Sequence, residues 1–275
     1  MIRKVVIPAA GMGSRFYPLT RAQPKEMLPL VDRPVIQYVV EEAVKSGLDE
    51  ILIIVGAWKD AIINYFDRHS LDSMYPDDSI QDLPDVYFIR QKEQRGLADS
   101  IMYAKKFTGD DDFVVLLGDT VYESFSKDTV TSQLINAYNK HGRTLIGLEK
   151  VDRNLVNHYG IVSLDPDTMR IVEAVEKPEP EDAPSNLAIT GTYIFNSNIY
   201  DYMESLNPGK NNELQLTDAL NMMCRNGEVF GSIISGKRYD IGTIELWLDG
   251  FLNFLDKNSK YSHVLNDFYK KINGK

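Results

Sequence analysis

Four short apolar runs in the first half of the chain, each with a helical segment after it, constrain the fold most. Runs of this length without polar alternation are typical of strands buried on both faces of a sheet. The runs are Lys4–Ala10, Ile51–Val55, Val86–Arg90 and Phe113–Leu117. Segments with helical spacing are Pro34–Ser46, Trp58–Arg68, Leu97–Phe107 and Thr129–Lys140, and a fifth strand is expected over Thr144–Leu148. This alternation predicts an α/β fold, a Rossmann-like doubly wound sheet that is mixed but mostly parallel, with helices on both faces.

The second half of the chain has a different pattern, in which the segments that connect the expected strands and helices are shorter. Its expected strands are Tyr159–Leu164, Met169–Glu176, Ala188–Phe195 and Phe230–Ile234, and its expected helices are Ser197–Ser205, Glu213–Arg225 and Ile244–Lys257. This pattern predicts a mixed sheet region that continues the same core. We therefore expect one domain over residues 1–258, made of parts at about 1–150 and about 151–242. A polar surface loop is expected over Ser70–Pro84, and a tail over 259–275 as a terminal helix or an oligomer contact.

Positive charge is concentrated at the start of an acidic chain. The formal net charge is −10, yet residues 1–33 hold six Lys or Arg and two Asp or Glu, so that window is +4 and the rest is −14. Nucleic acid is not an expected partner without a dense basic stripe, whereas a local basic island suits a small, highly charged anion. No apolar run approaches the ~20 residues of a membrane span, and no signal-peptide pattern opens the sequence. Cys224 is the only cysteine, which excludes an internal disulfide and favours a reducing cytoplasm.

The loop after the first strand, Ala9–Pro29, carries two glycines, three prolines and three of these cations. In a doubly wound sheet this loop lies beyond the carboxyl ends of the strands, where ligands bind. Gly11-Met12-Gly13 begins like a dinucleotide fingerprint, but Phe16 and Pro18 break the pattern, and a Walker A motif is absent. Taken alone, the loop is equally compatible with a glycine-containing turn that bears scattered surface cations.

A longer pattern resembles the sugar-1-phosphate nucleotidyltransferase family, whose members join a nucleoside triphosphate to a sugar 1-phosphate. The residues that carry this resemblance are Ala10-Gly11-Met12-Gly13-Ser14-Arg15, Pro18 and Pro24-Lys25. Further stretches resemble the bacterial-type UTP–glucose-1-phosphate uridylyltransferases in particular: Lys25–Asp32, Ile36–Ala43, Ala183–Ile189 and Leu214–Ala219. The resemblance runs from Lys4 to about Gly242, and it implies a nucleotide-binding part at about 1–150 and a sugar-phosphate-binding part at about 151–242.

The resemblance also implies roles for individual residues. It implies catalysis by Arg15, Lys25, Asp119 and Lys177, and Mg²⁺ ligation by Asp119 and Asp240. It implies nucleotide binding by Ala10, Gly11, Gly13, Ser14, Glu26, Gln91, Gly96 and Asp119. It implies sugar-phosphate binding by Tyr159, Gly160, Glu176, Lys177, Gly191 and Thr192. The chemistry fits, because glycines let backbone N–H groups approach phosphates and cations stabilise developing negative charge. One departure is that Ala98-Asp99 stands where relatives usually carry Gly-His, which leaves the base or ribose contacts open.

The reaction that the resemblance implies is a Mg²⁺-dependent in-line displacement, in which UTP and glucose 1-phosphate give UDP-glucose and pyrophosphate. A phosphate monoester, with a second pKa of about 6, is already an anionic nucleophile, so no general base is required. Two alternatives remain: a thymidylyltransferase that uses dTTP or another sugar-nucleotide pyrophosphorylase, and a catalytically silent sugar-nucleotide-binding regulator. The Lys25–Pro29 block favours the uridylyl branch, whereas Gly118-Asp119 and the short Ser70–Pro84 loop look nearer to the thymidylyl branch. The expected partners are small-molecule substrates and further copies of the chain in a homodimer or homotetramer, with no nucleic acid and no membrane.

Overall fold

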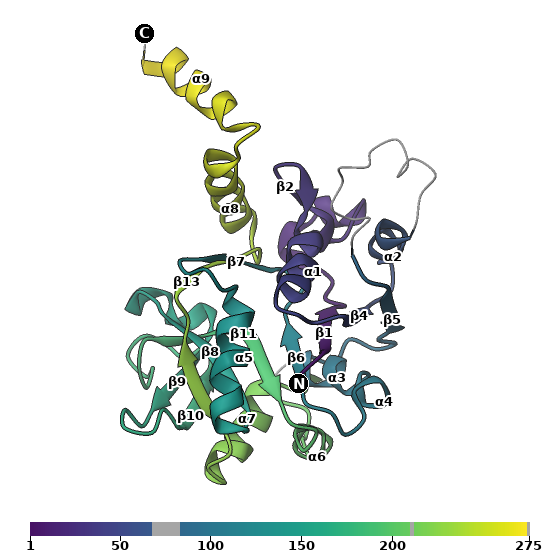
Figure 1. Cartoon of the computed structure of the whole chain (residues 1–275), viewed down its shortest axis with the longest axis vertical. Coiled ribbons are helices and arrows are strands. Elements are labelled where there is room, and N and C mark those ends of the chain that lie inside the picture. Colours follow the sequence, from purple (N-terminus) through teal and green to yellow (C-terminus); the bar gives the residue numbers. More distant parts are fainter. Residues whose placement is uncertain (68–82, 210–211, 274–275) are drawn as a thin grey trace.

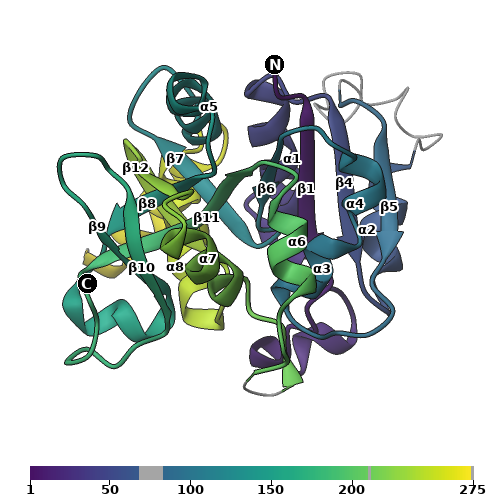
Figure 2. The same cartoon turned by 90° about the horizontal axis from the view of Figure 1, so that it is seen from below.

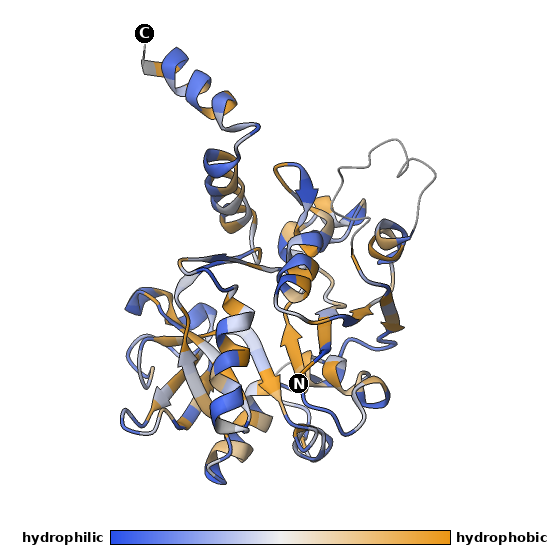
Figure 3. Cartoon of the chain, viewed as in Figure 1, coloured by the Kyte–Doolittle hydropathy of each residue, from blue (hydrophilic) through white to orange (hydrophobic). Residues whose placement is uncertain are grey.

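The predicted parallel strands form one half of a nine-stranded sheet in the computed structural model, which describes residues 1–67, 83–209 and 212–273 (Figure 1). Their order is β6-β1-β4-β5, and every pair among them is parallel. Figure 3 shows this block as the most continuous hydrophobic part of the sheet. The strands are β1 (Lys4–Ala9), β4 (Glu50–Val55), β5 (Val86–Arg90) and β6 (Phe113–Leu116).

Helices cover both faces of this block, as the sequence predicts. Val5 and Ile7 of β1 pack into one apolar core and Val6 into another, because successive residues of a strand point to opposite faces. The first face is covered by α1 (Val35–Lys45), α2 (Asp60–Phe66) and α5 (Val130–His141). The second face is covered by α3 (Leu97–Met102), α6 (Ile199–Glu204) and α7 (Leu216–Arg225).

The other half of the sheet is mainly antiparallel, and Figure 2 shows it beside the parallel block. The long strand β11 (Leu187–Phe195) joins the halves, because it runs antiparallel to β6 and also pairs with β8 and β9. The remaining strands are β8 (Leu145–Lys150), β9 (Gly160–Leu164), β10 (Ile171–Glu176) and β12 (Phe230–Ile233). The sheet is therefore continuous across the predicted boundary near residue 150, and a division into two binding parts stays a prediction.

Placing Thr144–Leu148 in the parallel block was wrong. The segment is a strand, β8, but it pairs with β11 and β12 rather than with the parallel block. The edge of β6 is already taken by antiparallel β11. Alternating strands and helices predict βαβ units, but they do not specify which edge of the sheet a later strand joins.

Several short elements escape the sequence patterns. The ribbon of β7 (Thr120–Ser124) and β13 (Gly236–Asp240) forms a separate two-stranded sheet, and β2 (Pro29–Leu30) pairs with β3 (Arg33–Pro34). The predicted helix Leu97–Phe107 is divided into α3 and α4 (Lys105–Thr108), because Tyr103 and Ala104 donate to carbonyls three residues back. Short 3-10 helices are η1 (Ser14–Phe16), η2 (Leu19–Arg21), η3 (Lys25–Met27) and η6 (Arg153–His158). Arg68 and most of the predicted loop Ser70–Pro84 lie outside the described residues.

The chain ends in two helices, α8 (Ile244–Lys257) and α9 (Ser262–Asn273). The predicted helix over 244–257 is confirmed, and the predicted tail contains a terminal helix. In Figure 1, α9 extends away from the sheet and its covering helices. Within the described ranges, no helix is both long enough and apolar enough to cross a membrane.

Candidate active site

A cleft of about 300 Å³ opens beyond the carboxyl ends of β6 and β10 and against the β7-β13 ribbon. It unites residues from both halves of the chain that the sequence singled out. The predicted site residues that line it are Arg15, Lys25, Asp119, Tyr159, Gly160, Glu176, Lys177, Gly191 and Asp240. The position agrees with the rule that doubly wound sheets bind ligands at the carboxyl ends of their strands.

Two aspartates meet in this cleft because of strand pairing. Asp119 follows β6, and Asp240 ends β13 directly opposite Thr120, the first residue of β7. The backbone N–H of Ile241 donates to the carbonyl of Asp119 at 2.8 Å, which joins the two segments. The ammonium group of Lys25, on η3, forms an ion pair with the Asp119 carboxylate.

Burial and the mutual charges of Asp119, Asp240 and Lys25 set the direction in which each pKa is shifted. Burial would raise the pKa of Asp119, but the neighbouring Lys25 outweighs burial and lowers it. The pKa of Asp240 is raised, first by burial and then by the charge of Asp119. Burial would lower the pKa of Lys25, yet Asp119, Glu26 and Asp240 together raise it, so this lysine keeps its charge.

Two crowded carboxylates suit a divalent cation. Mg²⁺ prefers carboxylate oxygens, takes only one or two from the protein, and completes its shell with phosphate oxygens and water. Asp119 and Asp240 provide that donor set, and a cation would relieve the repulsion that raises the pKa of Asp240. In the part of the chain that the structure describes, no three His, Cys, Asp or Glu gather as a complete metal site.

Arg15 differs from the other Lys and Arg side chains of the cleft. Lys25, Lys177 and Arg238 each form an ion pair with a carboxylate. Arg15, on η1, is exposed and has no ion pair among the described residues. An unpaired guanidinium at the mouth of a cleft is available for bidentate contact with a phosphate group.

The opposite wall is built by the end of β10. The hydroxyl of Thr217 donates to Oε2 of Glu176 at 2.7 Å, and Nζ of Lys177 lies 3.1 Å from Oε1 of the same carboxylate. Lys177 adopts a φ of 47°, and its N–H donates to the carbonyl of Tyr159 at 3.0 Å. A left-handed backbone is unfavourable for a residue with a Cβ and persists where the surroundings enforce it, often at functional sites.

The absence of a side chain at Gly160 leaves space for the Glu176 carboxylate. It faces Glu176 in the β9-β10 pairing. A Cβ atom at Gly160 would lie 3.1 Å from Cδ1 of Ile189 and 3.4 Å from Oε2 of Glu176. A larger residue would therefore crowd the carboxylate that the resemblance assigns to sugar binding.

A second cavity of about 630 Å³ lies on the side that is predicted to bind the nucleotide, and we call it the nucleotide-side cavity. Two residues predicted to bind nucleotide, Ser14 and Gln91, line it together with the exposed Trp58. Gln91 is only 3 % exposed, and its Nε2 donates to Oδ2 of Asp99 at 2.7 Å. Gln94 also lines the cavity, and its Nε2 donates to the carbonyl of Ala10 at 2.6 Å. This cavity therefore offers an aromatic surface and two held amide groups, of which Gln91 is the buried one.

Six of the predicted residues line neither cavity: Ala10, Gly11, Gly13, Glu26, Gly96 and Thr192. Glu26 is 2 % exposed and accepts from Nζ of Lys59 at 2.6 Å. Burial raises the pKa of Glu26, against the opposing effects of Lys59 and Lys25. Thr192 is fully buried, and its hydroxyl donates to the hydroxyl of Tyr122. The side chains of Glu26 and Thr192 therefore face the core, where each supports a neighbour, and any contact of these two residues with a ligand stays a prediction.

The glycines of this group shape the backbone instead. Gly13 has a φ of 64° and precedes η1, a conformation that a residue with a Cβ rarely adopts. Gly96 has a φ of 97°, and a Cβ there would lie 2.6 Å from the carbonyl oxygen of Leu214. Any contact of Ala10, Gly11, Gly13 or Gly96 with a nucleotide stays a prediction.

Sequence reasoning missed Arg238. Its guanidinium lies 2.6 Å from Oε1 of Glu149, donates to the carbonyl of Ile189, and stacks 4.1 Å from the ring centre of Tyr159. The available signal was its spacing, because residues two apart on a strand share a face and Asp240 was already a candidate. Arg238 thus orients Tyr159 at the cleft wall.

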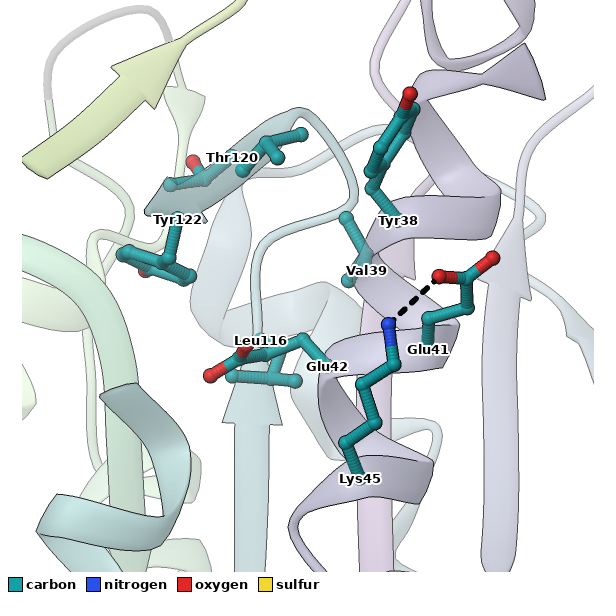
Figure 4. Close-up of a pocket in the computed structure, with 9 residues that line it drawn as sticks. Tyr38, Val39, Glu41, Glu42, Lys45, Leu116, Thr120 and Tyr122 are labelled. Carbon is teal, nitrogen blue, oxygen red and sulfur yellow. Dashed lines mark hydrogen bonds and ion pairs between the residues drawn. The ribbon is translucent and has the colours of Figure 1, made fainter. Parts of the chain in front are cut away.

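A third cavity, of about 80 Å³, lies between α1 and the start of β7 (Figure 4). Its two carboxylates are already engaged. Glu41 pairs with Lys45 at 3.0 Å, and Glu42 accepts from the backbone N–H of Thr131 at 2.7 Å. The cavity is small and its polar groups are satisfied, so it is a packing space rather than a second active site.

Comparisons with known proteins agree with this geometry. The sequence profile of the family described as nucleotidyl transferase matches residues 4–257. A UTP–glucose-1-phosphate uridylyltransferase from Bacillus subtilis is 42% identical over 255 residues, 88% of this chain and 85% of the relative. Its counterpart from Mycoplasma pneumoniae is 44% identical over 259 residues, 88% of both chains.

Solved structures match the whole fold. A UDP-glucose pyrophosphorylase complexed with UDP-glucose superposes with a TM-score of 0.88 at 36% identity, covering 94% of this chain and 100% of the other. A UTP-bound enzyme of the same kind from Acinetobacter baumannii superposes with a TM-score of 0.86 at 33% identity, covering 98% and 99%. The chain belongs to the nucleotidyl transferase family.

Proposed function

We propose that this chain joins UTP and glucose 1-phosphate to give UDP-glucose and pyrophosphate. The observation that carries the proposal is the meeting of three groups in one cleft: the cations Arg15 and Lys25, the paired Asp119 and Asp240, and the Glu176-Lys177 wall. Relatives named UTP–glucose-1-phosphate uridylyltransferase, at about 40% identity over most of the chain, support the choice of substrates.

In this proposal the residues act by position and charge. Lys177 holds the phosphate of glucose 1-phosphate, whose oxygen attacks the α-phosphorus of UTP. Arg15 and Lys25 stabilise the negative charge that develops on the phosphates and on the departing pyrophosphate. Glu176, held by Thr217, accepts hydrogen bonds from the sugar hydroxyls. The nucleophile is anionic near neutral pH, so the cleft requires no general base.

Mg²⁺ is the proposed cofactor, with Asp119 and Asp240 as its protein ligands. When bound, it would neutralise charge on the triphosphate, as divalent cations do in phosphoryl transfer. The charge of Asp119, which contributes to the raised pKa of Asp240, supports this arrangement, because a divalent cation between the two carboxylates would relieve their repulsion. Removal of divalent cations with a chelator is expected to abolish turnover.

The location and assembly of the protein are also proposals. The single cysteine, Cys224, is buried and free, which suits a reducing cytoplasm. Val264, Phe268 and Ile272 lie four residues apart on α9, so they share one exposed face, and Tyr269 lies beside it. A contiguous apolar face on a projecting helix supports a homodimer or homotetramer. Light scattering coupled to gel filtration measures the assembly directly.

Pyrophosphate release tests the reaction. Five triphosphates (UTP, dTTP, CTP, GTP and ATP) are paired with the 1-phosphates of glucose, galactose, mannose and N-acetylglucosamine, with and without Mg²⁺. The highest rate is expected with UTP and glucose 1-phosphate. A maximum at dTTP would assign the chain to thymidylyl transfer with the same mechanism. Nucleotide binding without turnover in any pairing would instead indicate a regulator.

A further inference from the structure

We propose that Asp99 is a positioning residue that sets base selectivity, because it fixes the Gln91 amide so that its oxygen faces the nucleotide-side cavity. This inference rests on the proposed function, in which Gln91 contacts the base of the triphosphate. Asp99 itself is not expected to touch the nucleotide, since it is only 1 % exposed.

Three residues form a chain of hydrogen bonds behind the cavity, in which Gln91 and Asp99 are buried and Arg95 is exposed. Nε2 of Gln91 donates to Oδ2 of Asp99 at 2.7 Å. Nη2 of Arg95 donates to the other oxygen, Oδ1, at 2.8 Å. Each oxygen of the carboxylate therefore has its own donor. The chain is anchored at both ends, because the backbone N–H of Gln91 donates to Val55 and Asp99 lies in the first turn of α3.

The chemistry of Asp99 removes the usual ambiguity of an amide side chain. A glutamine amide can turn over and exchange its oxygen with its nitrogen. An ionised carboxylate only accepts hydrogen bonds, and here one oxygen of Asp99 accepts from Gln91 and the other from the guanidinium of Arg95. The nitrogen of Gln91 must therefore face Asp99, which leaves Oε1 as the group available to the cavity that Gln91 lines. No other described residue donates to this oxygen.

A fixed amide oxygen distinguishes bases by their ring nitrogen. Uracil and thymine carry an N–H at position 3, which donates to such an oxygen. Cytosine has an unprotonated ring nitrogen there, which would face Oε1 with two acceptors opposed. A site built around one hydrogen bond rejects an analogue that cannot form it, because its polar group is left unpaired. We therefore expect UTP and dTTP to be accepted and CTP to be rejected.

The informative variant is Asp99→Asn, which keeps the size of the side chain. Arg95 remains a donor, so it favours the Asn oxygen on its own side and turns the Asn nitrogen toward Gln91. Gln91 would then accept with its oxygen and present its nitrogen to the cavity. The expected result is a fall of about tenfold or more in the ratio of kcat/KM for UTP to that for CTP, with a gain in the CTP value itself.

A matched control is Asp49→Asn. Asp49 also accepts from an arginine, Arg3, at 2.7 Å, but this pair is exposed and neither residue lines the cleft or the nucleotide-side cavity. The UTP-to-CTP ratio of this variant should equal that of the unchanged chain. Circular dichroism and the unfolding midpoint are recorded for both variants, so that a loss of fold is recognised.

The outcomes separate the inference from the proposed function. A gain for CTP in Asp99→Asn supports the positioning role. An equal loss for both nucleotides, or no change in the ratio, overturns it. If the unchanged chain turns over no UTP, the proposed function fails, and the same ratio is then measured as Kd values. A preference for UTP over CTP that Asp99→Asn abolishes still supports the inference, and the absence of any preference in the unchanged chain overturns it.

Discussion

The two walls of the cleft hold their cations in different ways. On the wall to which the proposed function assigns the nucleotide (the nucleotide-side wall), Lys25 pairs with Asp119 and the nearby Lys59 with Glu26, across 94 and 33 positions of sequence. On the wall to which it assigns the sugar phosphate (the sugar-side wall), Lys177 pairs with the adjacent Glu176, its side chain is 49 % exposed, and its backbone is left-handed. Burial and long-range ion pairs thus fix the first wall, whereas local backbone geometry positions the second.

Lys25 and Glu26 are adjacent in the chain, but their side chains lie on opposite sides of the nucleotide-side wall. These consecutive residues of η3 point in opposite directions, one into the cleft and the other into the core. Both are charged, and both have a partner of opposite sign. The outward pair can exchange its partner for a ligand, whereas the inward pair cannot lose a member without leaving a buried charge.

The largest expected effect concerns Arg15, which lines the cleft and has no ion pair among the described residues. Arg15→Ala should lower kcat/KM by about 10²–10⁴-fold, because a cation that stabilises transferred phosphate is lost. Its free energy of unfolding should change by less than about 0.5 kcal/mol, since Arg15 is exposed. Pyrophosphate release and urea unfolding measure the two quantities. Arg3→Ala, at an exposed arginine far from the cleft, is the control. Turnover within threefold of the unchanged chain would refute the role of Arg15.

The next effect is on stability. Lys59→Met should cost about 3–5 kcal/mol, because it leaves Glu26 buried without its main partner. Burial already raises the pKa of Glu26, and loss of Lys59 would raise it further. A carboxyl group with a raised pKa in the folded state contributes its stability below its unfolded pKa and loses it as the pH rises. The loss in free energy of unfolding caused by Lys59→Met should therefore be larger at about pH 8 than at about pH 5.

Urea unfolding at both pH values tests this comparison. The double variant Glu26→Gln with Lys59→Met removes the titrating group, so its deficit should no longer depend on pH. An equal deficit for Lys59→Met at both pH values would show that lost packing, rather than an unpaired charge, is the cause.

The smallest effect tests the strain of the sugar-side wall. At Lys177, glycine tolerates the φ of 47° and valine does not, so Lys177→Gly should be more stable than Lys177→Val by about 1–2 kcal/mol. The matched position is Lys150, an exposed residue at the end of β8 without a positive φ. There valine should be the more stable of the two, because glycine weakens a strand. If the Gly and Val variants had the same order of stability at both positions, backbone strain at Lys177 would be refuted.

Local patterns predicted the parallel half of the molecule well. The runs that became β1, β4, β5 and β6 are apolar except for Lys4 and Arg90 at their ends. Strands covered by helices on both faces need no polar side, and only β5, at the edge of the sheet, is half-exposed. Asp119 could be placed at the ligand side for the same reason, since it directly follows such a run. Cys224 is buried in α7, which agrees with an apolar helix face.

Pairings between distant short segments could not be predicted in this way. β7 and β13 are only five residues each, mix polar and apolar residues, and pair across 112 to 120 positions, from Gly236 with Ser124 to Asp240 with Thr120. The inward direction of Glu26 and the place of Arg238 both depend on such pairings. Glu26 has no periodic signal, because a single charged residue has the same sequence pattern in a solvated turn and in a buried ion pair. Arg238 offers only its two-residue spacing from Asp240.

By itself the sequence determined the alternation of buried strands and helices, the glycine loop, and the charged residues that could face a phosphate. These features depend on residues close together in the chain, where spacing and side-chain type decide the conformation. Only the tertiary structure decided which charges share the cleft, which are sealed behind it, and which way the Gln91 amide points. Those outcomes depend on contacts between segments far apart in sequence, whose partners become neighbours only when the chain packs.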